Sequence, residues 1–185
     1  MTYCLKLFFS TLLTLGVYLS IFVSTSFAFA CTSNVASGNF SAAGSWSSCN
    51  DTTPQTTDTI TINNGHTIIL TATTTVAGIT INSGGTLASG TRTLTDSGNF
   101  TNNGSITGTT STLSLSGTGA TIDGTGTYSP TGLITITNNK TINNTANFSF
   151  PGAVTISSGT TTNNGAISVT GILRVTGTFS NGGTV

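Results

Sequence analysis

The sequence predicts an all-β protein, a right-handed parallel β-helix (β-solenoid) of about seven coils of roughly twenty residues each. An Asn- and Gly-rich turn recurs at near-constant spacing, and short segments of alternating apolar and polar residues lie between these turns. Polar but uncharged residues dominate, because charged residues make up only 4% of the chain and the net charge is zero. The four basic residues are scattered, so we expect no nucleic-acid partner.

Residues 1–30 differ from the rest and are predicted to be a signal peptide. Lys6 precedes the apolar run LFFSTLLTLGVYLSIFV, and the small residues Ala28 and Ala30 end the segment in the A-x-A pattern of a cleavage site. An uncleaved membrane anchor is the alternative, because about twenty apolar residues can span a bilayer. The A-x-A ending favours cleavage after Ala30. We therefore expect Sec-dependent export to the cell surface or medium, with no membrane insertion of the mature chain.

The two cysteines that remain after processing are Cys31 and Cys49. Exported proteins fold in an oxidising compartment, so we predict that these two residues form a disulfide. Lipid modification of Cys31 at the new N-terminus is the alternative. The bulky Phe29 stands where a lipoprotein motif usually has a small residue, which favours the disulfide.

The repeat covers residues 58–185, and each coil is marked by a Thr or Ser that enters a turn. Seven marks follow one another at steps of 19, 21, 20, 20, 21 and 18 residues: Thr61, Thr80, Thr101, Thr121, Thr141, Thr162 and Ser180. Coils of about twenty residues at roughly 3.3 Å per residue, stacked about 4.8 Å apart, account for this recurrence. The hairpins of an antiparallel sandwich or barrel would account for the turns but not for their spacing.

Short strands with period two lie between the marks, with apolar residues on one face and Thr on the other. They are written in the sequence as TITI, GITI, TLSLS, LITIT, AVTIS and LRVTG. Their apolar residues recur at the coil spacing, so we expect Ile136 to pair with Leu115 on one side and Ile156 on the other. Asn at the turns tolerates positive φ and can form ladders of hydrogen bonds from coil to coil.

Both ends of such a stack need protection, because an open sheet edge can pair with another strand. Residues 31–57 are predicted to cap the first end: their composition differs from that of the coils, and they contain Trp46, Phe40 and Pro54. The last residues, TFSNGGTV, repeat the pattern of NFTNNGSI at 99–106. We therefore expect Val185 to be a truncation point, with a truncated C-terminus of the β-helix.

The segments SGNFSAAGSW, DTITINNGHTIIL and VAGITINSGGTL resemble the N-terminal part of secreted bacterial β-helix surface proteins, such as haemagglutinin-like adhesins and autotransporter passengers. Phe40 stands where this family has an aromatic residue, and Asp58 matches the Asp before its first strand. The pattern covers residues 35 to 117. The resemblance implies an architecture rather than an activity, because many unrelated surface proteins share it.

The sequence predicts no catalytic, cofactor-binding or metal-ligating residue. The carboxylates of the mature chain are Asp51, Asp58, Asp96 and Asp123. Glycoside hydrolysis needs two carboxyl groups within about 5 to 10 Å of one another, and the 27-residue separation of Asp96 and Asp123 is not a whole number of coils. Arg92 is expected to form at most a surface pair with Asp96. His66 has no second ligand at metal spacing, and we expect it to be a solvated turn residue.

We therefore expect a non-enzymatic, exported structural or adhesion segment of a bacterial surface or secreted repeat protein, with carbohydrate or a host or neighbouring cell surface as its partner. The sequence does not fix an oligomeric state. Two alternatives remain: a carbohydrate-active enzyme whose active site lies beyond residue 185, and an ice-binding β-solenoid that presents rows of outward Thr.

Overall fold

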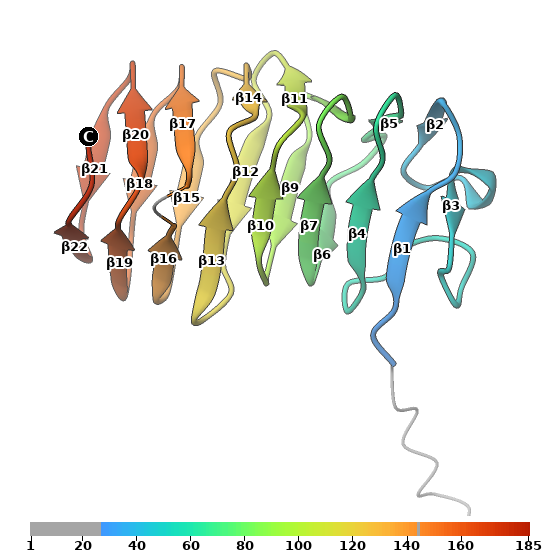
Figure 1. Ribbon diagram of the computed structural model, residues 1–185, viewed down its shortest axis with the longest axis horizontal. Coiled ribbons are helices and arrows are strands. Elements are labelled where there is room, and N and C mark those ends of the chain that lie inside the picture. The colour runs from blue at the N-terminus through green and yellow to red at the C-terminus, as the bar shows by residue number, and fades with distance from the viewer. Residues whose placement is uncertain (1–26, 144) are drawn as a thin grey trace, which may run out of the picture.

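The computed structural model describes residues 27–143 and 145–185. The predicted signal peptide therefore lies outside the described residues except for its last four positions. The remainder is almost entirely β-structure, wound into a parallel β-helix (Figure 1).

Each complete coil contributes one strand to each of three faces. Sheet A consists of β1 (Ala30–Ser33), β4 (Thr59–Ile62), β7 (Gly78–Ile81), β10 (Phe100–Asn102), β13 (Ala120–Asp123), β16 (Lys140–Ile142), β19 (Thr160–Asn163) and β22 (Thr178–Asn181), with β3 (Trp46–Ser47) at its end. Sheet B consists of β2 (Ser37–Asn39), β5 (Thr67–Ile69), β8 (Thr86–Gly90), β11 (Ser105–Gly108) and β14 (Thr127–Tyr128), and it is followed by the pair β17 (Asn147–Phe150) and β20 (Ala166–Val169). Sheet C consists of β6 (Thr74–Val76), β9 (Thr93–Asp96), β12 (Thr112–Leu115), β15 (Ile134–Ile136), β18 (Val154–Ile156) and β21 (Leu173–Val175).

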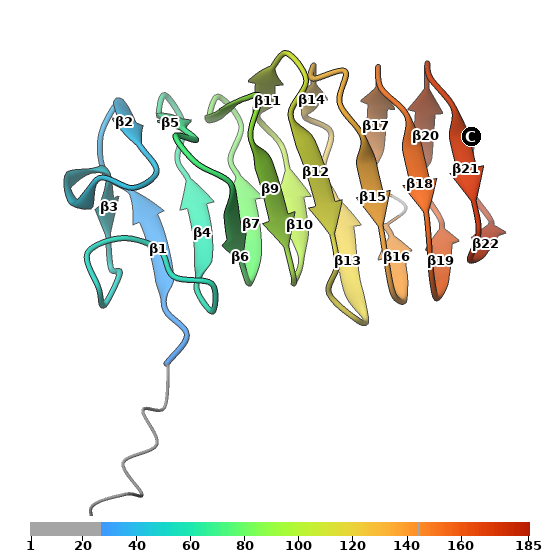
Figure 2. The ribbon, with the colours of Figure 1, turned by 180° about the vertical axis from the view of Figure 1, so that it is seen from behind.

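The coil is right-handed, as predicted. Strands of sheet A such as β4 and β13 point upwards on the near side in Figure 1, and the strands of sheet C run downwards on the opposite side, seen from behind in Figure 2. Successive coils advance towards the left in Figure 1, and this sense of rotation and advance defines a right-handed helix. Sheet C has six strands, so the structure holds about six complete coils rather than seven. The last mark, Ser180, belongs to β22, which opens a further coil.

The predicted register is confirmed on sheet C. Ile136 pairs with Leu115 on one side and with Ile156 on the other, and every strand of this sheet is parallel to its neighbours. These residues face the interior and are almost fully buried. Like residues therefore stack upon like residues along the axis, which gives the core its regular columns.

One step of the predicted repeat is wrong. The marks align Thr101 with Thr121, but in the structure Thr101 pairs with Asp123 and Phe100 pairs with Ile122. A two-residue shift keeps the same faces inside and outside, so alternation alone cannot exclude it. The observed register stacks one large apolar side chain on another. The added length lies in the turn from sheet C to sheet A. In this coil the turn runs from Leu115 to Ile122, whereas the equivalent turn two coils earlier runs only from Val76 to Ile79.

Hydroxyl groups tie this same corner of the coil to the coil before it. Ser or Thr side chains donate to backbone carbonyl oxygens of the preceding coil at 3.0 to 3.5 Å. The donors are Ser97, Ser116, Thr137 and Thr176, and the acceptors are the carbonyls of Val76, Asp96, Leu115 and Ile156. We call this series the hydroxyl ladder.

Residues 31–57 contribute strands to the first coil as well as closing its end. β1 pairs in parallel with β4, and β3 pairs with the other edge of β1 in the antiparallel sense. A short 3₁₀ helix, η1 (Ala43–Ser45), leads into β3. The Trp46 ring packs edge-on against Phe40, and its Nε1 donates to the Phe40 carbonyl at 2.7 Å. The predicted disulfide between Cys31 and Cys49 is present.

Candidate functional site: a hollow on sheet A

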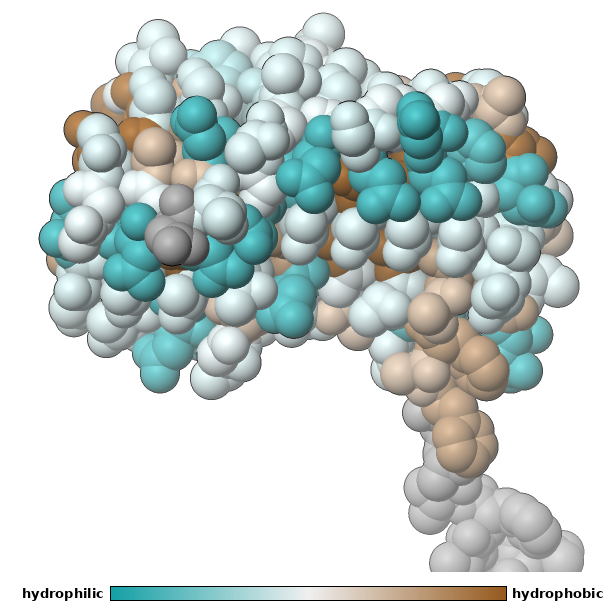
Figure 3. Space-filling view, in the orientation of Figure 1, coloured by the Kyte–Doolittle hydropathy of each residue, from teal (hydrophilic) through white to brown (hydrophobic). Residues whose placement is uncertain are grey.

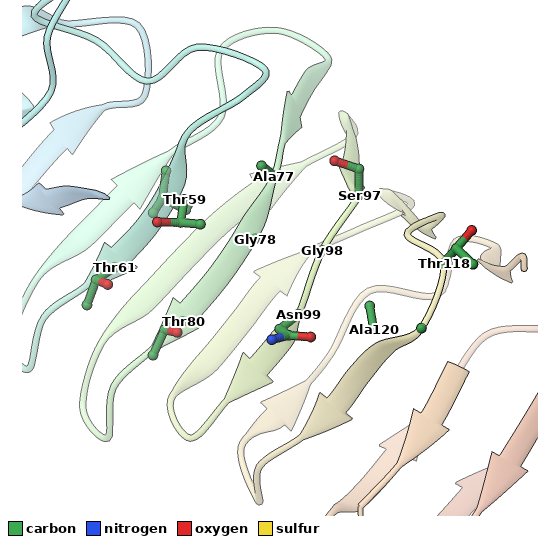
Figure 4. A pocket seen from close by; sticks show the side chains of 12 residues that line it. Thr59, Thr61, Ala77, Gly78, Thr80, Ser97, Gly98, Asn99, Thr118 and Ala120 are labelled. Carbon is green, nitrogen blue, oxygen red and sulfur yellow. The ribbon is translucent and has the colours of Figure 1, made fainter. Parts of the chain in front are cut away.

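A hollow of the described surface lies on sheet A and extends over four successive coils. It has a volume of about 460 Å³. Its lining comes from β4, from β7 and the residue before it, and from the segments that lead into β10 and β13: Thr59, Ile60, Thr61, Ala77, Gly78, Thr80, Ser97, Gly98, Asn99, Thr118, Gly119 and Ala120. Figure 4 shows these residues on four adjacent coils.

The hollow exists because three successive coils enter sheet A through pairs of very small residues. The pairs are Ala77–Gly78, Ser97–Gly98 and Gly119–Ala120. At Gly98 a side chain is impossible without a shift of the backbone, because a Cβ would lie 1.7 Å from the carbonyl oxygen of Ala77. Gly78 pairs with Thr59, and a Cβ there would lie 3.2 Å from the Thr59 methyl group and 3.4 Å from the Asn99 carbonyl oxygen. The long turn before β13 then closes one end of the hollow with Thr118.

The rim of the hollow carries neutral hydrogen-bonding groups. The hydroxyls of Thr59, Thr61 and Thr80 can each donate and accept. The side-chain oxygen of Asn99 accepts the backbone N–H of Thr121 at 2.9 Å, which fixes the orientation of its amide. The arrangement offers several oriented polar contacts and no charge.

The lining of the hollow also includes a smaller apolar part. Ala77, Ala120 and the edge of Ile60 contribute carbon atoms between the polar rim groups. In the space-filling view, brown atoms show through between pale and teal side chains on the face that sheet A presents (Figure 3). The lining can therefore form several neutral hydrogen bonds and a smaller apolar contact with a ligand.

Asp96 lies inside the coil rather than on the surface. It is the last residue of β9 and is fully buried, whereas Arg92 is exposed, so the expected surface pair between them is wrong. Burial raises the pKa of Asp96 to about 6. Two weaker effects lower this pKa: the Gly98 N–H donates to Oδ1 at 3.0 Å, and Lys140 carries a positive charge. Lys140 is also buried; its Nζ donates to the Gly117 carbonyl, and desolvation lowers its pKa.

Asp123 lies at the end of β13 on the outer side of sheet A, apart from Asp96. Its Oδ2 accepts the side-chain amide of Asn143 at 2.8 Å, and its Oδ1 accepts the hydroxyl of Thr145 at 2.7 Å and the backbone N–H of Gly124 at 2.7 Å. The hydrogen bond from Asn143 is the main cause that lowers the pKa of this carboxyl group. Asp123 therefore connects one coil to the next as an anion.

His66 is half-buried rather than solvated. Its Nδ1 lies 2.8 Å from the hydroxyl of Ser33, which also accepts the backbone N–H of Asn63 at 2.9 Å. His66 lies at the predicted turn, but it is less exposed than expected because Ser33 of the preceding coil contacts its ring. The side chain links the turn after β4 to the end of β1.

Asn side chains form the expected links between coils, both on the surface and in the interior. Asn163 is fully buried, and its amide donates to Oδ1 of Asn181 at 2.7 Å and to the Thr184 carbonyl at 3.1 Å. Asn102 occupies the same corner earlier in the chain and donates to the Thr127 carbonyl at 3.0 Å. These amides satisfy backbone groups at the bend from sheet A to sheet B.

Within residues 27–143 and 145–185, no group of three or more His, Cys, Asp or Glu side chains could hold a metal ion. In the same part of the chain, no helix is both long enough and apolar enough to cross a membrane.

Comparison of the chain with protein-family models, with curated proteins and with solved structures finds no match. The fold and the hollow define the class: an all-β parallel β-solenoid with a disulfide near its first coil and a neutral, hydroxyl-rich face.

Sequence reasoning missed the hollow. The available signal was the small-residue pair at 77–78, 97–98 and 119–120, which recurs at about the coil spacing. At Gly98 glycine is required by the close approach of the Ala77 carbonyl, whereas Gly119 has a φ of 70° and lies in the turn before β13.

Proposed function

We propose that this chain is a non-enzymatic, exported structural and adhesion segment of a bacterial surface or secreted repeat protein, and that the hollow on sheet A contacts neutral carbohydrate. The resemblance to secreted bacterial β-helix surface proteins supports the class. The hollow, whose lining combines Thr and Asn side chains with a smaller apolar part, supports the ligand chemistry and is the observation that carries the proposal.

The contact is expected to be weak for a single site. A typical neutral hydrogen bond contributes about 0.5 to 1.5 kcal/mol net, and the hollow contains no aromatic ring for a sugar to stack upon. A surface protein gains avidity when several copies engage the same polymer. Low affinity for one site is therefore compatible with firm attachment.

The test is binding of the purified chain to an array of neutral polysaccharides, followed by titration with a soluble oligosaccharide. Thr80→Val removes a rim hydroxyl with little change of shape, and we expect it to weaken binding about 3- to 10-fold. Thr155→Val is the matched control, because Thr155 lies on sheet C, away from the hollow, and should bind as the unchanged chain does. Equal losses in both variants, or no binding to any neutral glycan, would contradict the carbohydrate contact.

One observation favours ice binding as a second candidate. The outward positions of sheet C form an unbroken row of hydroxyl residues in register: Thr75, Thr95, Ser114, Thr135 and Thr155. The corresponding row on sheet A is interrupted where Thr101 meets Asp123. Thermal hysteresis of the purified chain tests this candidate; it should be lost in Thr135→Ala and retained in Thr80→Val if sheet C binds ice.

A further inference from the structure

The residues just before the predicted cleavage point are part of the fold. The Phe29 carbonyl accepts the backbone N–H of Thr59 at 2.9 Å, and Ala30 is the first residue of β1, in register with Thr59 of β4. The side chain of Phe27 is 71% exposed, and Ala28 is exposed as well. The ordered contacts of the first coil thus begin at Phe29.

Phe29 also meets a buried carboxylate. Its backbone N–H donates to Oδ1 of Asp58 at 2.8 Å, and the second oxygen of Asp58 accepts the backbone N–H of Gln55 at 2.8 Å. Asp58 is 2% exposed. A buried carboxylate is costly unless a positive charge accompanies its hydrogen bonds, yet both of these donors are neutral.

We propose that the exported chain is cleaved between Ala28 and Phe29, and that the new α-ammonium group of Phe29 forms an ion pair with Asp58. The inference rests on the proposed export. Water hydrolyses the Ala28–Phe29 amide: its oxygen enters the new carboxylate of Ala28, and the nitrogen of Phe29 takes up protons to become an ammonium group. That nitrogen is the atom that already lies 2.8 Å from Asp58.

The sequence permits this site. Ser26 and Ala28 are small residues at the third and first positions before the bond, which is the pattern that signal peptidases accept. Cleavage after Ala30 would instead remove the donor to Asp58, the acceptor for Thr59 and the first paired residue of β1. Cleavage after Ala28 keeps all three and supplies the missing positive charge.

The first experiment is secretion of the full chain from a bacterial host, with the intact mass and the N-terminal peptide of the product determined by mass spectrometry. We expect a chain that begins at Phe29. A chain that begins at Cys31 would overturn this inference while leaving export intact. An unprocessed chain retained in the cell would overturn export itself.

The second experiment tests the ion pair. Lys140 is the single lysine after residue 28, so the α-amine of the purified product can be acetylated selectively at neutral pH in denaturant, with the disulfide intact, before refolding. Acetylation keeps an N–H donor but removes the charge, and we expect Tm to fall by about 2 to 4 °C. In Asp58→Asn, acetylation should leave Tm unchanged. An equal effect of acetylation in both chains, or no effect in either, would refute the pair.

Discussion

Replacement of the buried carboxylate Asp96 by Asn should stabilise the protein at neutral pH. Asp96 is the last residue of β9, and its side chain points into the coil and is fully buried. Asn has nearly the same shape, and its oxygen can accept the Gly98 N–H as Oδ1 of Asp96 does at 3.0 Å. The substitution therefore removes the negative charge and leaves the packing in place.

The magnitude follows from the pKa. Burial raises the pKa of Asp96 from 3.8 to about 6, and two pKa units correspond to about 3 kcal/mol. Because the folded pKa lies above the unfolded one, the folded chain binds this proton more tightly. The free energy of unfolding should therefore fall as pH rises from about 4 to about 6 and stay low above that. Asp96→Asn should remove this fall, with a gain of about 3 kcal/mol at neutral pH and almost none at a pH of about 3.5.

Urea denaturation at a series of pH values measures this effect. Asp51→Asn is the matched control, because it makes the same chemical change at an exposed position. Asp96→Asn and the unchanged chain should converge at low pH and separate as pH rises. A constant difference at all pH values, or lower stability of Asp96→Asn at neutral pH, would refute the assignment of Asp96 as a destabilising buried acid.

Three further substitutions test the packing. Gly98→Ala should lower the free energy of unfolding by about 3 kcal/mol or more, because the new Cβ would strike the Ala77 carbonyl. Gly44→Ala is the control, because a Cβ at Gly44 meets nothing within 4 Å. Equal effects of the two substitutions would contradict the close approach at Gly98. Cys49→Ser should cost about 3 kcal/mol, from loss of a disulfide that spans 18 residues, and the unchanged chain should drop to the same stability when reduced. Phe148→Ala should cost about 3 to 5 kcal/mol in denaturant titration, since this ring is 1% exposed; a loss below 1 kcal/mol would show that the core refills the space.

The architecture could be predicted because two independent periods agree in the sequence. Alternation of apolar residues fixes which side of a strand is inside, and recurrence at about twenty residues fixes which strands are neighbours. Ile136, with its partners Leu115 and Ile156, is placed correctly by these two periods alone. A parallel coil has few other degrees of freedom, so the fold follows.

The register between Thr101 and Asp123 could not be predicted from the same periods. The turns are so alike in composition that a shift of two residues preserves both the alternation and the Asn-Gly pattern. The choice depends on packing of Phe100 over Ile122 and on the longer turn before β13, which are three-dimensional properties.

The position of Asp96 is a different kind of failure. Inward and outward side chains alternate along β9, so the inward Leu94 places Asp96 on the inner side as well. The side chains of Leu94 and Asp96 are both buried, as this alternation requires. The expectation of a surface pair gave charge more weight than alternation. Asp96 pairs with Val76 and Leu115, whose side chains point inward, so the register of the sheet places residue 96 inside even though it is a carboxylate.

The hydroxyl ladder has a mechanical consequence. Tension applied along the rod axis loads the hydrogen bonds between adjacent coils lengthwise, and those of all three faces must stretch together. The ladder adds side-chain links to these backbone bonds at one corner, at Ser97, Ser116, Thr137 and Thr176. The corner from sheet C to sheet A is therefore one reinforced seam of the rod, and the Asn links at the bend from sheet A to sheet B form a second one that also resists separation of the coils.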